Sequence, residues 1–422
     1  MFNFIHAADI HLDSPLRGVE VHEELARNAI RGATRRAFDN LVDLALRERS
    51  AFIVLAGDLF DGDWKDFNTG LYFAQHMARL NAAGIAVFIV SGNHDAVSHV
   101  SKALHLPENV HIFSMRRPET HRLDTVQVAL HGQGYAIRAV SEDLSRNYPA
   151  PVEGCFNIGV LHTALNGREG HEVYAPCTVD GLRAKGYQYW ALGHVHRREV
   201  VLKHDPWIVF PGNPQGRSIR ETGPKGCTMV TVSEGVVTNL EHVDLDVLRW
   251  DLCTVEVAGC RTSEAILEKT RDGLLHSLVK GEGRPVVARL VLRGATDMHQ
   301  QLQANPIPWE EALRSQAAEL GGERLWLEKI RFQTREQLDL ETLIESNEAL
   351  GGLVKNLLDL ELDAQALREI DPDFDAFQNK LPAELLSGEE PFAPLQAEQW
   401  AEIREDVKNL LVARLLETGS RP

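Results

Sequence analysis

Five short motifs in the first half of the chain combine carboxylate, amide and imidazole side chains, which are groups that can hold metal ions. Along the chain they are Asp9-Ile10-His11, Gly57-Asp58-Leu59-Phe60-Asp61, Gly92-Asn93-His94-Asp95, His162 and Gly193-His194-Val195-His196. Each motif alone also fits a surface turn, a helix cap or a buried structural histidine. Because a chance origin would need five coincidences at once, the complete set indicates a single two-metal site for phosphoester chemistry.

The donor types limit which metals and which reaction are expected. Carboxylate and amide oxygens with imidazole nitrogens, and without thiolates, suit Mn²⁺, Fe²⁺ or Zn²⁺ rather than a cysteine-bound structural zinc. Two such ions roughly 3.5 to 4 Å apart can clamp the attacking and the leaving oxygen of an in-line displacement at phosphorus. We therefore expect two divalent metal ions as cofactors.

An apolar run precedes each motif, as expected for a buried strand that ends at a loop. The runs occupy residues 4–8, 52–56, 85–90, 158–161 and 189–192. Loops at the carboxyl ends of strands converge in a layered sheet, so the motifs are expected to meet at one edge. Apolar spacing predicts helices over 21–49 and 67–83, and strands dominate after residue 126, including 228–232 and 236–240. These elements predict an α+β fold in which helices flank a two-sheet sandwich.

The motif series resembles that of the calcineurin-like metallophosphoesterases, whose pattern is D-x-H, G-D-x-x-D, G-N-H-D/E, H and G-H-x-H. Residues 210–218, Phe-Pro-Gly-Asn-Pro-Gln-Gly-Arg-Ser, are similar to a segment of the DNA repair exonucleases in the YhaO and SbcD-like nuclease branch. The superfamily resemblance covers residues 1–245 and implies a four-layer α/β/β/α sandwich. It also implies manganese as the preferred metal.

The resemblance further implies a role for each motif residue. One metal ion would be held by Asp9, His11, Asp58 and His196, and the other by Asp58, Asn93, His162 and His194, with Asp58 bridging. His94 would face the phosphate or the leaving oxygen, and Asp95 would orient the His94 imidazole through a hydrogen bond. Nucleases of this kind often have a histidine where this chain has Asp61, which leaves the role of Asp61 open.

Charge is distributed unevenly along the chain. The net charge is −17, and residues 339–422 contain 19 acidic and 7 basic residues, so the first 338 residues carry only −5. The nuclease body therefore need not repel DNA. Candidate phosphate contacts are Arg197, Arg198, Arg217, Arg220 and Lys225 near the last motif, and Arg35 and Arg36 near the start. The alternative is that these are ordinary solvated side chains.

Composition is that of a soluble protein with ample core. The chain has 422 residues, of which 44% are hydrophobic and 25% charged, and this length predicts two or three domains. No apolar run approaches the roughly 18 residues that span a bilayer, and the first strand leaves no room for a cleavable signal. The five cysteines, 155, 177, 227, 253 and 260, include no C-x-x-C pair, so we expect reduced thiols and a cytoplasmic location.

A second module is predicted after the metal motifs. Strands at 252–257, 285–292 and 325–332 alternate with helices at 262–279 and 309–320, which predicts a small α/β domain. In the resembling nucleases such a module caps the active site and helps to select DNA. We therefore divide the chain into a catalytic domain (1–245), a capping domain (246–337) and an acidic helical region (338–422).

The acidic region contains two predicted amphipathic helices, 340–360 and 397–416, separated by the Pro- and Asp-rich segment 371–375. They fit either a solvated tail or a docking element, because several leucines on them require burial. These are Leu343, Leu350, Leu353, Leu357, Leu410, Leu411 and Leu415. The family resemblance implies an SMC-like ATPase as the docking partner and also implies a homodimer.

The preferred function is a two-metal-dependent DNA exonuclease that serves DNA repair. One alternative is a phosphoesterase for nucleotides, cyclic nucleotides or phosphoproteins, because the metal motifs do not separate these substrates. The other alternative is a scaffold that keeps the fold without catalysis. The complete ligand set and the additional histidine His94 argue against a scaffold, which would have no need of that histidine.

Overall fold

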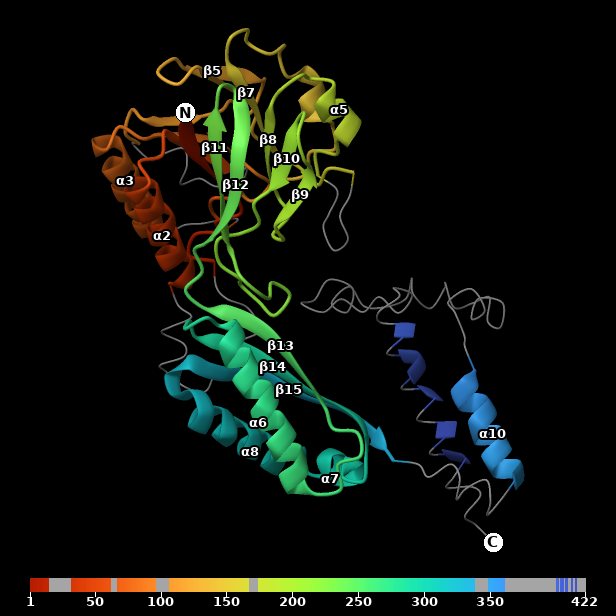
Figure 1. Ribbon diagram of the computed structural model, residues 1–422. Coiled ribbons are helices and arrows are strands. Elements are labelled where there is room, and N and C mark those ends of the chain that lie inside the picture. The colour runs from red at the N-terminus through yellow and green to blue at the C-terminus, as the bar shows by residue number, and fades with distance from the viewer. Residues whose placement is uncertain are drawn as a thin grey trace. The chain divides into compact units, whose positions relative to one another are not determined.

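The structure is a computed structural model of the chain (Figure 1). It describes residues 1–14, 32–61, 67–95, 106–166, 174–337, 348–360, 400–401, 403–405, 407–408, 411–412 and 414–415. The chain forms two compact units. The first comprises Met1–Cys253, Arg271–Leu290 and Ala312–Ile330, and the second comprises Thr254–Thr270, Val291–Glu311 and Arg331–Pro422.

The first unit contains a six-stranded sheet in the order β12-β11-β1-β2-β3-β4. Its parallel strands are β1 (Phe2–Ala7), β2 (Phe52–Ala56), β3 (Ala86–Val90) and β4 (Val110–Ile112). The antiparallel strands β11 (Gly226–Ser233) and β12 (Val236–Asp244) extend the sheet on the other side of β1. Helices α2 (Ala33–Arg47) and α3 (Phe67–Ala82) lie between the parallel strands in the chain. The predicted βαβ beginning is therefore confirmed, although residues 21–31 of the first predicted helix lie outside the described residues.

A second six-stranded sheet has the order β5-β6-β7-β8-β10-β9. Its parallel strands are β6 (Val128–Gly132), β7 (Phe156–His162), β8 (Tyr189–Gly193) and β10 (Trp207–Phe210). The antiparallel strands β5 (Glu119–Leu123) and β9 (Glu199–Leu202) form its two edges. The short helices η2 (Leu144–Asn147) and α5 (Val179–Arg183) lie between its strands along the chain.

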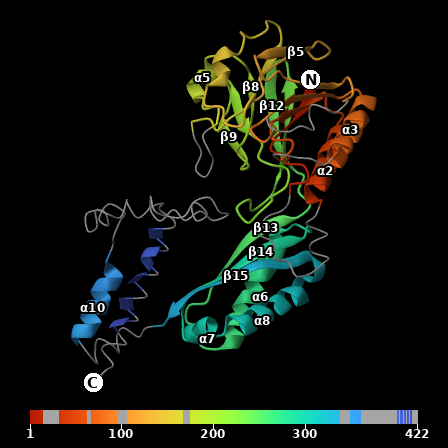
Figure 2. The ribbon, with the colours of Figure 1, turned by 180° about the vertical axis from the view of Figure 1, so that it is seen from behind.

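Both sheets are buried on two faces, which explains why the inner strands β2, β3 and β8 are apolar without alternation. In β2, Val54 points into the core between the two sheets, whereas Ile53 and Leu55 pack with the apolar face of α2 and α3. In β8, Tyr189 points into the inter-sheet core and Trp190 packs outward with Leu182 of α5. These layers form the expected α/β/β/α sandwich, and Figure 2 shows the same arrangement from behind.

Beyond the sandwich, a three-stranded sheet has the order β13-β14-β15. Its strands are β13 (Arg249–Glu256), β14 (Val286–Thr296) and β15 (Leu325–Glu336). β13 is connected to β14 by helix α6 (Ser263–Lys280). β14 is connected to β15 by helices α7 (His299–Ala304) and α8 (Pro306–Gly321) and the short η3 (Gly322–Arg324). The predicted alternation of strands and helices is confirmed, with α7 and η3 as additional elements. The boundary between the two compact units passes through all three strands. The division into domains at residues 245/246 and 337/338 stays a prediction.

The segment after the last metal motif is tied to the start of β13. Gln215 donates a hydrogen bond to the backbone oxygen of Leu248 (3.0 Å) and accepts one from the backbone N–H of Val247 (2.9 Å). The indole N–H of Trp250 donates to the backbone oxygen of Gly216 (3.0 Å). Trp250 is buried, so this bond lies in a nonpolar environment in which its loss would be costly.

In the second unit, helix α10 (Glu348–Asp359) lies beside the helical residues between 400 and 415 (Figures 1 and 2). Val354 and Val412 are buried, and the Lys408 ammonium donates to the backbone oxygen of Leu358 (2.6 Å). The rest of the two predicted C-terminal helices, the segment 371–375, and Leu343 and Leu410 lie outside the described residues. Among the described helices, none has the length and apolar character needed to cross a membrane.

Candidate metal centre

The structure brings all five motifs together at the carboxyl ends of the parallel strands. The β1 loop carries Asp9 and His11, the β2 loop Asp58, and the β3 loop Asn93, while His162 ends β7 and the β8 loop carries His194 and His196. Three groups of side chains have ligand atoms within 4.8 Å of one another: Asp9, His11 and His196; His11, Asp58 and His94; and Asp58, His162 and His194. The buried potential ligands include Asp9, His11, Asp58, Asn93, His162 and His194.

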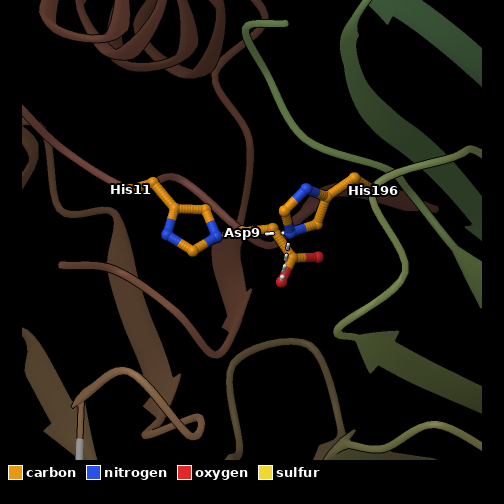
Figure 3. Close-up of side chains that lie close together, drawn as sticks. All are labelled: Asp9, His11 and His196. Carbon is orange, nitrogen blue, oxygen red and sulfur yellow. Dashed lines mark hydrogen bonds and ion pairs between the residues drawn. The ribbon is translucent and has the colours of Figure 1, made fainter. Parts of the chain in front are cut away.

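The first group contains two imidazole rings and a carboxylate that face one another (Figure 3). The Nε2 atoms of His11 and His196 are 3.3 Å apart, and Nε2 of His196 is 4.0 Å from Oδ1 of Asp9. Two nitrogens bound to one ion at about 2.0 to 2.1 Å would lie roughly 3 Å apart. The spacing of His11 and His196 therefore fits a shared divalent ion.

Asp58 lies between His11 of this first group and His162 of the third group. Its Oδ2 is 3.8 Å from Nε2 of His11 and 3.5 Å from Nε2 of His162, while its Oδ1 accepts a hydrogen bond from the backbone N–H of His94 (2.9 Å). A single carboxylate oxygen between two sets of nitrogen donors has the position expected of a bridging ligand. The donors therefore fit two divalent ions.

Hydrogen bonds to main chain and carboxylate set the tautomers of two histidines. Nδ1 of His162 donates to the backbone oxygen of Ala56 (3.0 Å), and Nδ1 of His196 donates to Glu221 (2.7 Å). In the neutral rings, each Nε2 then carries its lone pair into the site. Nε2 of His162 is also 2.9 Å from Oδ1 of Asn93, so these two acceptor atoms need either a proton or a cation between them.

The ligand loops have unusual backbone geometry. Asp9, His11, Asp58 and His194 all have positive φ, between 45° and 102°. Such conformations cost about 1 to 3 kcal/mol each for residues with a side chain, and they persist where surrounding structure enforces them. Gly92 is required for close approach, because a Cβ there would lie 2.3 Å from Oδ1 of Asp58.

Burial and mutual charge shift the pKa values of the buried groups. Burial raises the pKa of Asp9 to about 6 and lowers that of His11 to about 3. Burial alone would lower the pKa of His162, but the nearby Asp58 carboxylate raises it to about 9. Burial would raise the pKa of Asp58, but interaction with His162 and His11 holds it well below its usual range.

Metal binding near pH 7.5 is expected to release about one proton, because His162 is protonated at that pH without a metal and must be neutral to bind one. The apparent Mn²⁺ affinity should therefore fall as pH falls below about 9, by up to about tenfold per unit. Calorimetric titrations in buffers of different ionisation enthalpy measure this proton. Binding heats that do not depend on the buffer would contradict the expectation. His162→Asn is the control, because metal binding to this variant should no longer release the proton.

His94 does not have the predicted partner. Asp95 accepts hydrogen bonds from the backbone N–H groups of Leu59, Phe60 and Gly92, at 2.9 to 3.2 Å. Nδ1 of His94 instead lies 2.8 Å from Oδ1 of Asp61. The predicted Asp95–His94 hydrogen bond is therefore wrong: Asp95 holds the β2 and β3 loops together, and Asp61 orients the imidazole.

Two further residues that the sequence analysis did not assign support the site. Glu221 accepts hydrogen bonds from His196, from the Asn213 amide (2.8 Å) and from the backbone N–H of Arg217 (2.8 Å). Ser14 donates to Asp61 (2.7 Å) and accepts from Arg217 (3.2 Å). A Glu eight residues after Asn213 has no strong sequence signal, because only the fold of the intervening loop brings it to His196.

Replacement of Glu221 by glutamine should weaken binding of one of the two ions by about 10- to 100-fold. The neutral amide keeps the volume of the side chain but loses the charge-assisted bond that fixes the orientation of His196. Titration calorimetry with Mn²⁺ measures the change, and Glu153→Gln at an exposed position is the matched control. Equal affinities for wild type and Glu221→Gln would show that His196 needs no such support.

The arginines predicted to contact phosphate lie at different distances from the metal centre. Arg217 borders the metal site, since Nη1 is 3.8 Å from Asp61 and Nη2 is 3.5 Å from Nδ1 of His196. Arg197 and Arg220 are exposed, whereas Arg198 lines a separate cavity. Arg35 forms an ion pair with Asp13 and stacks on Tyr72, which gives it a structural role. The side chains of Arg197 and Arg220 stay predicted phosphate contacts.

Comparison with known proteins agrees with this geometry. The family model for calcineurin-like phosphoesterases matches residues 2–198, and the model for the middle domain of the metallophosphoesterase YhaO matches residues 250–335. The chain is 35% identical to the metallophosphoesterase YhaO of Bacillus subtilis (strain 168) over 360 residues, which are 84% of this chain and 86% of that protein.

More distant relatives are DNA double-strand break repair proteins named Mre11. That of Methanopyrus kandleri is 28% identical over 302 residues, covering 65% of this chain and 63% of the relative. That of Sulfurisphaera tokodaii is 24% identical over 300 residues, covering 67% and 74%. A solved structure of a dimetal phosphatase from Danio rerio is 13% identical with a TM-score of 0.34, covering 58% of this chain and 97% of that one.

The family match and the geometry of the site therefore agree on the chemistry. The YhaO relative extends over both the sandwich and the following α/β segment, so the relationship is not limited to the metal motifs. The buried histidine and aspartate groups provide donors for two divalent ions, as a phosphoester hydrolase requires. The chain belongs to the calcineurin-like metallophosphoesterases, and within them to the YhaO family.

Proposed function

We propose that this protein is a metal-dependent DNA exonuclease that acts in DNA repair in the cytoplasm. The observation that carries the proposal is the position of Asp61 between the His94 imidazole and the Arg217 guanidinium, beside the metal ligands. Its Oδ1 contacts His94 and its Oδ2 faces Arg217. One carboxylate thereby places a candidate proton donor and a candidate phosphate contact at the same margin of the site.

His94, Asp61 and Arg217 each have a distinct chemical role in the proposed reaction. When bound, the two ions, with manganese as the preferred metal, supply Lewis-acid polarisation of the phosphate ester. Nδ1 of His94 donates to Asp61, which leaves Nε2 to give a proton to the departing oxygen. Burial opposes the charged form of His94, but Asp61 and Asp58 raise its pKa, which favours the imidazolium that acts as proton donor. Arg217 binds a nonbridging phosphate oxygen.

Two observations favour DNA over a small ester. The relatives named Mre11 match about 300 residues, well beyond the metal motifs, and they are named as DNA double-strand break repair proteins. The basic residues Arg197 and Arg220 are exposed in segments flanking the site, where a polymer backbone can reach them. A small phosphoester would need only the inner contacts to Arg217 and His94.

The test supplies the purified protein and Mn²⁺ with linear duplex DNA, covalently closed duplex DNA, bis(p-nitrophenyl) phosphate and a phosphopeptide in parallel. We expect linear DNA to be degraded from its ends, with much slower attack on the closed circle. Preference for the small ester or the phosphopeptide would replace the proposal by a phosphoesterase of small or protein substrates. No hydrolysis of any of the four would indicate a scaffold.

We also propose that the second unit docks a partner of the SMC-like ATPase class. Its described helices leave apolar side chains exposed, with Leu353 53%, Val407 48% and Leu411 41% accessible. Exposed leucine and valine side chains on two short packed helices can serve as anchors that a partner covers. The acidic charge of residues 339–422 would restrict this surface to a partner with a complementary basic rim.

Substitution of both Leu353 and Leu411 by aspartate should abolish co-purification with such an ATPase while metal content stays at the wild-type level. The substituted side chains are exposed, so the helices should remain folded. Val279→Asp on α6 changes a similarly exposed apolar side chain elsewhere and serves as the control. Retained co-purification of the double variant would contradict the docking role.

A further inference from the structure

A cavity of about 500 Å³ lies between the β9–β10 hairpin and β12. β9 is the last strand of the second sheet, and β12 is the outer strand of the first sheet (Figure 1). The cavity therefore occupies the free edge of the sandwich, where the two sheets are not closed by a further strand. Its volume is in the range of small-molecule binding sites.

The floor of the cavity is apolar, because it is the margin of the inter-sheet core. Val200, Trp207 and Leu240 pack against that core while remaining partly accessible. Val237 adds a fourth apolar residue, and the remaining lining residues are polar, including the cationic side chains Arg198 and Lys203. Among the described residues that line the cavity there is no carboxylate, although the chain as a whole carries −17. Such a local excess of positive charge favours an anionic ligand.

Arg198 is the residue of the cavity lining that is nearest to a metal ligand in the sequence. It follows the ligand His196 by two residues, and its Nε is buried without a hydrogen-bond partner among the described residues. A buried donor with no acceptor is costly unless a ligand supplies one. Arg198 lines the cavity together with residues 237–240, so its side chain lies near β12.

Trp207 gives the cavity an aromatic surface. Its ring lies 4.9 Å from the ring of His204, with the two planes inclined by 65°. An accessible tryptophan beside arginine and lysine is the combination with which proteins bind a nucleobase and its phosphate. Thr238 and Asn239 on the opposite wall can supply hydrogen bonds to a base edge.

We propose that this cavity binds a nucleotide unit, with the phosphate on Arg198 and Lys203 and the base against Trp207. The inference rests on the proposed nuclease function, since a strand leaving the metal site or a released mononucleotide would both present this chemistry. Binding itself requires no metal ion, so it can be measured separately from hydrolysis.

The test measures binding of a fluorescein-labelled oligothymidylate to the full chain by anisotropy in the presence of EDTA. Lys203→Glu changes an exposed residue outside the metal centre and should weaken binding by about tenfold or more. Arg122→Glu reverses an exposed charge on β5, at the opposite edge of the same sheet, and should have no more than about a twofold effect.

A second comparison tests the aromatic surface. An abasic strand of equal length should bind wild type about tenfold more weakly than oligothymidylate, and Trp207→Leu should remove this difference while keeping apolar contact with the core. Competition by thymidine monophosphate would identify a released nucleotide as the occupant. Competition by unlabelled strand alone would identify the strand.

Three results would overturn the proposal. The first is an equal loss of binding in Lys203→Glu and Arg122→Glu, and the second is no loss in either variant. The third is equal binding of abasic and thymidine strands to wild type. Hydrolysis of bis(p-nitrophenyl) phosphate and of linear DNA with Mn²⁺ is measured on the same proteins, so an absent nuclease activity is distinguished from an absent nucleotide site.

Discussion

Replacement of Asp58 by asparagine is expected to deplete both metal ions and to lower kcat/KM for phosphodiester hydrolysis by about 10³-fold or more. The reason is the position of Oδ2, which is within 4 Å of Nε2 of both His11 and His162. A neutral amide cannot offset the charge of two divalent ions. The loss of the carboxylate also removes the interaction that raises the pKa of His162.

Metal content by plasma mass spectrometry and turnover of bis(p-nitrophenyl) phosphate measure the two effects. Asp180→Asn, at a side chain that is 92% exposed on α5, is the matched control and should behave as wild type. If Asp58→Asn retained two ions per chain, the bridging position assigned to this carboxylate would be incorrect. Retention of one ion would restrict Asp58 to one site.

Replacement of His94 by alanine should have the opposite combination of effects: metal content near wild type, with hydrolysis reduced by about 10²- to 10⁴-fold. His94 belongs to the margin of the site, where its side chain is 28% exposed, and Asp61 holds its Nδ1. Removal of the ring takes away the proposed proton donor without removing Asp58, His11 or His196. Normal turnover by His94→Ala would contradict the proposed role.

Substitution of Asp61, the hydrogen-bond partner of His94, tests the role of His94 through the pH dependence of activity. If the imidazolium donates the proton, activity falls as pH rises through the pKa of His94. Asp61→Asn removes a carboxylate that raises this pKa, so the decline should move to lower pH. Asp95→Asn should leave the position of the decline unchanged, because Asp95 bonds to main-chain N–H groups of the β2 and β3 loops.

The sequence predicts where the motif residues lie, because the position of each depends on a local pattern. A run of apolar residues followed by Asp or His marks the end of a buried strand, and parallel strands bring such ends to one edge. The ends of β1, β2, β3, β7 and β8 confirm this expectation. The two-sheet sandwich followed from the same runs, together with the helical spacing between them.

The supporting contacts could not be predicted in the same way. Asp95 is adjacent to His94 in the chain, yet the turn at Asn93 and His94 lets its carboxylate bond to main-chain N–H groups. Asp61 and Glu221 reach their histidines only through loops whose conformation depends on the packed fold. Neither contact follows from residue spacing, because the partners are separated by more than twenty residues.

The hydrogen bonds between the loop at residues 213–221 and the start of β13 determine where the chain can be truncated without disturbing the metal centre. A polypeptide cut after residue 245 keeps every metal ligand but lacks Val247, Leu248 and Trp250, which anchor Gln215 and Gly216. The loop that carries Glu221 would then lose its hydrogen bonds to residues 247–250. Shortened versions of this enzyme should therefore end beyond Trp250 if the imidazole of His196 is to stay aligned.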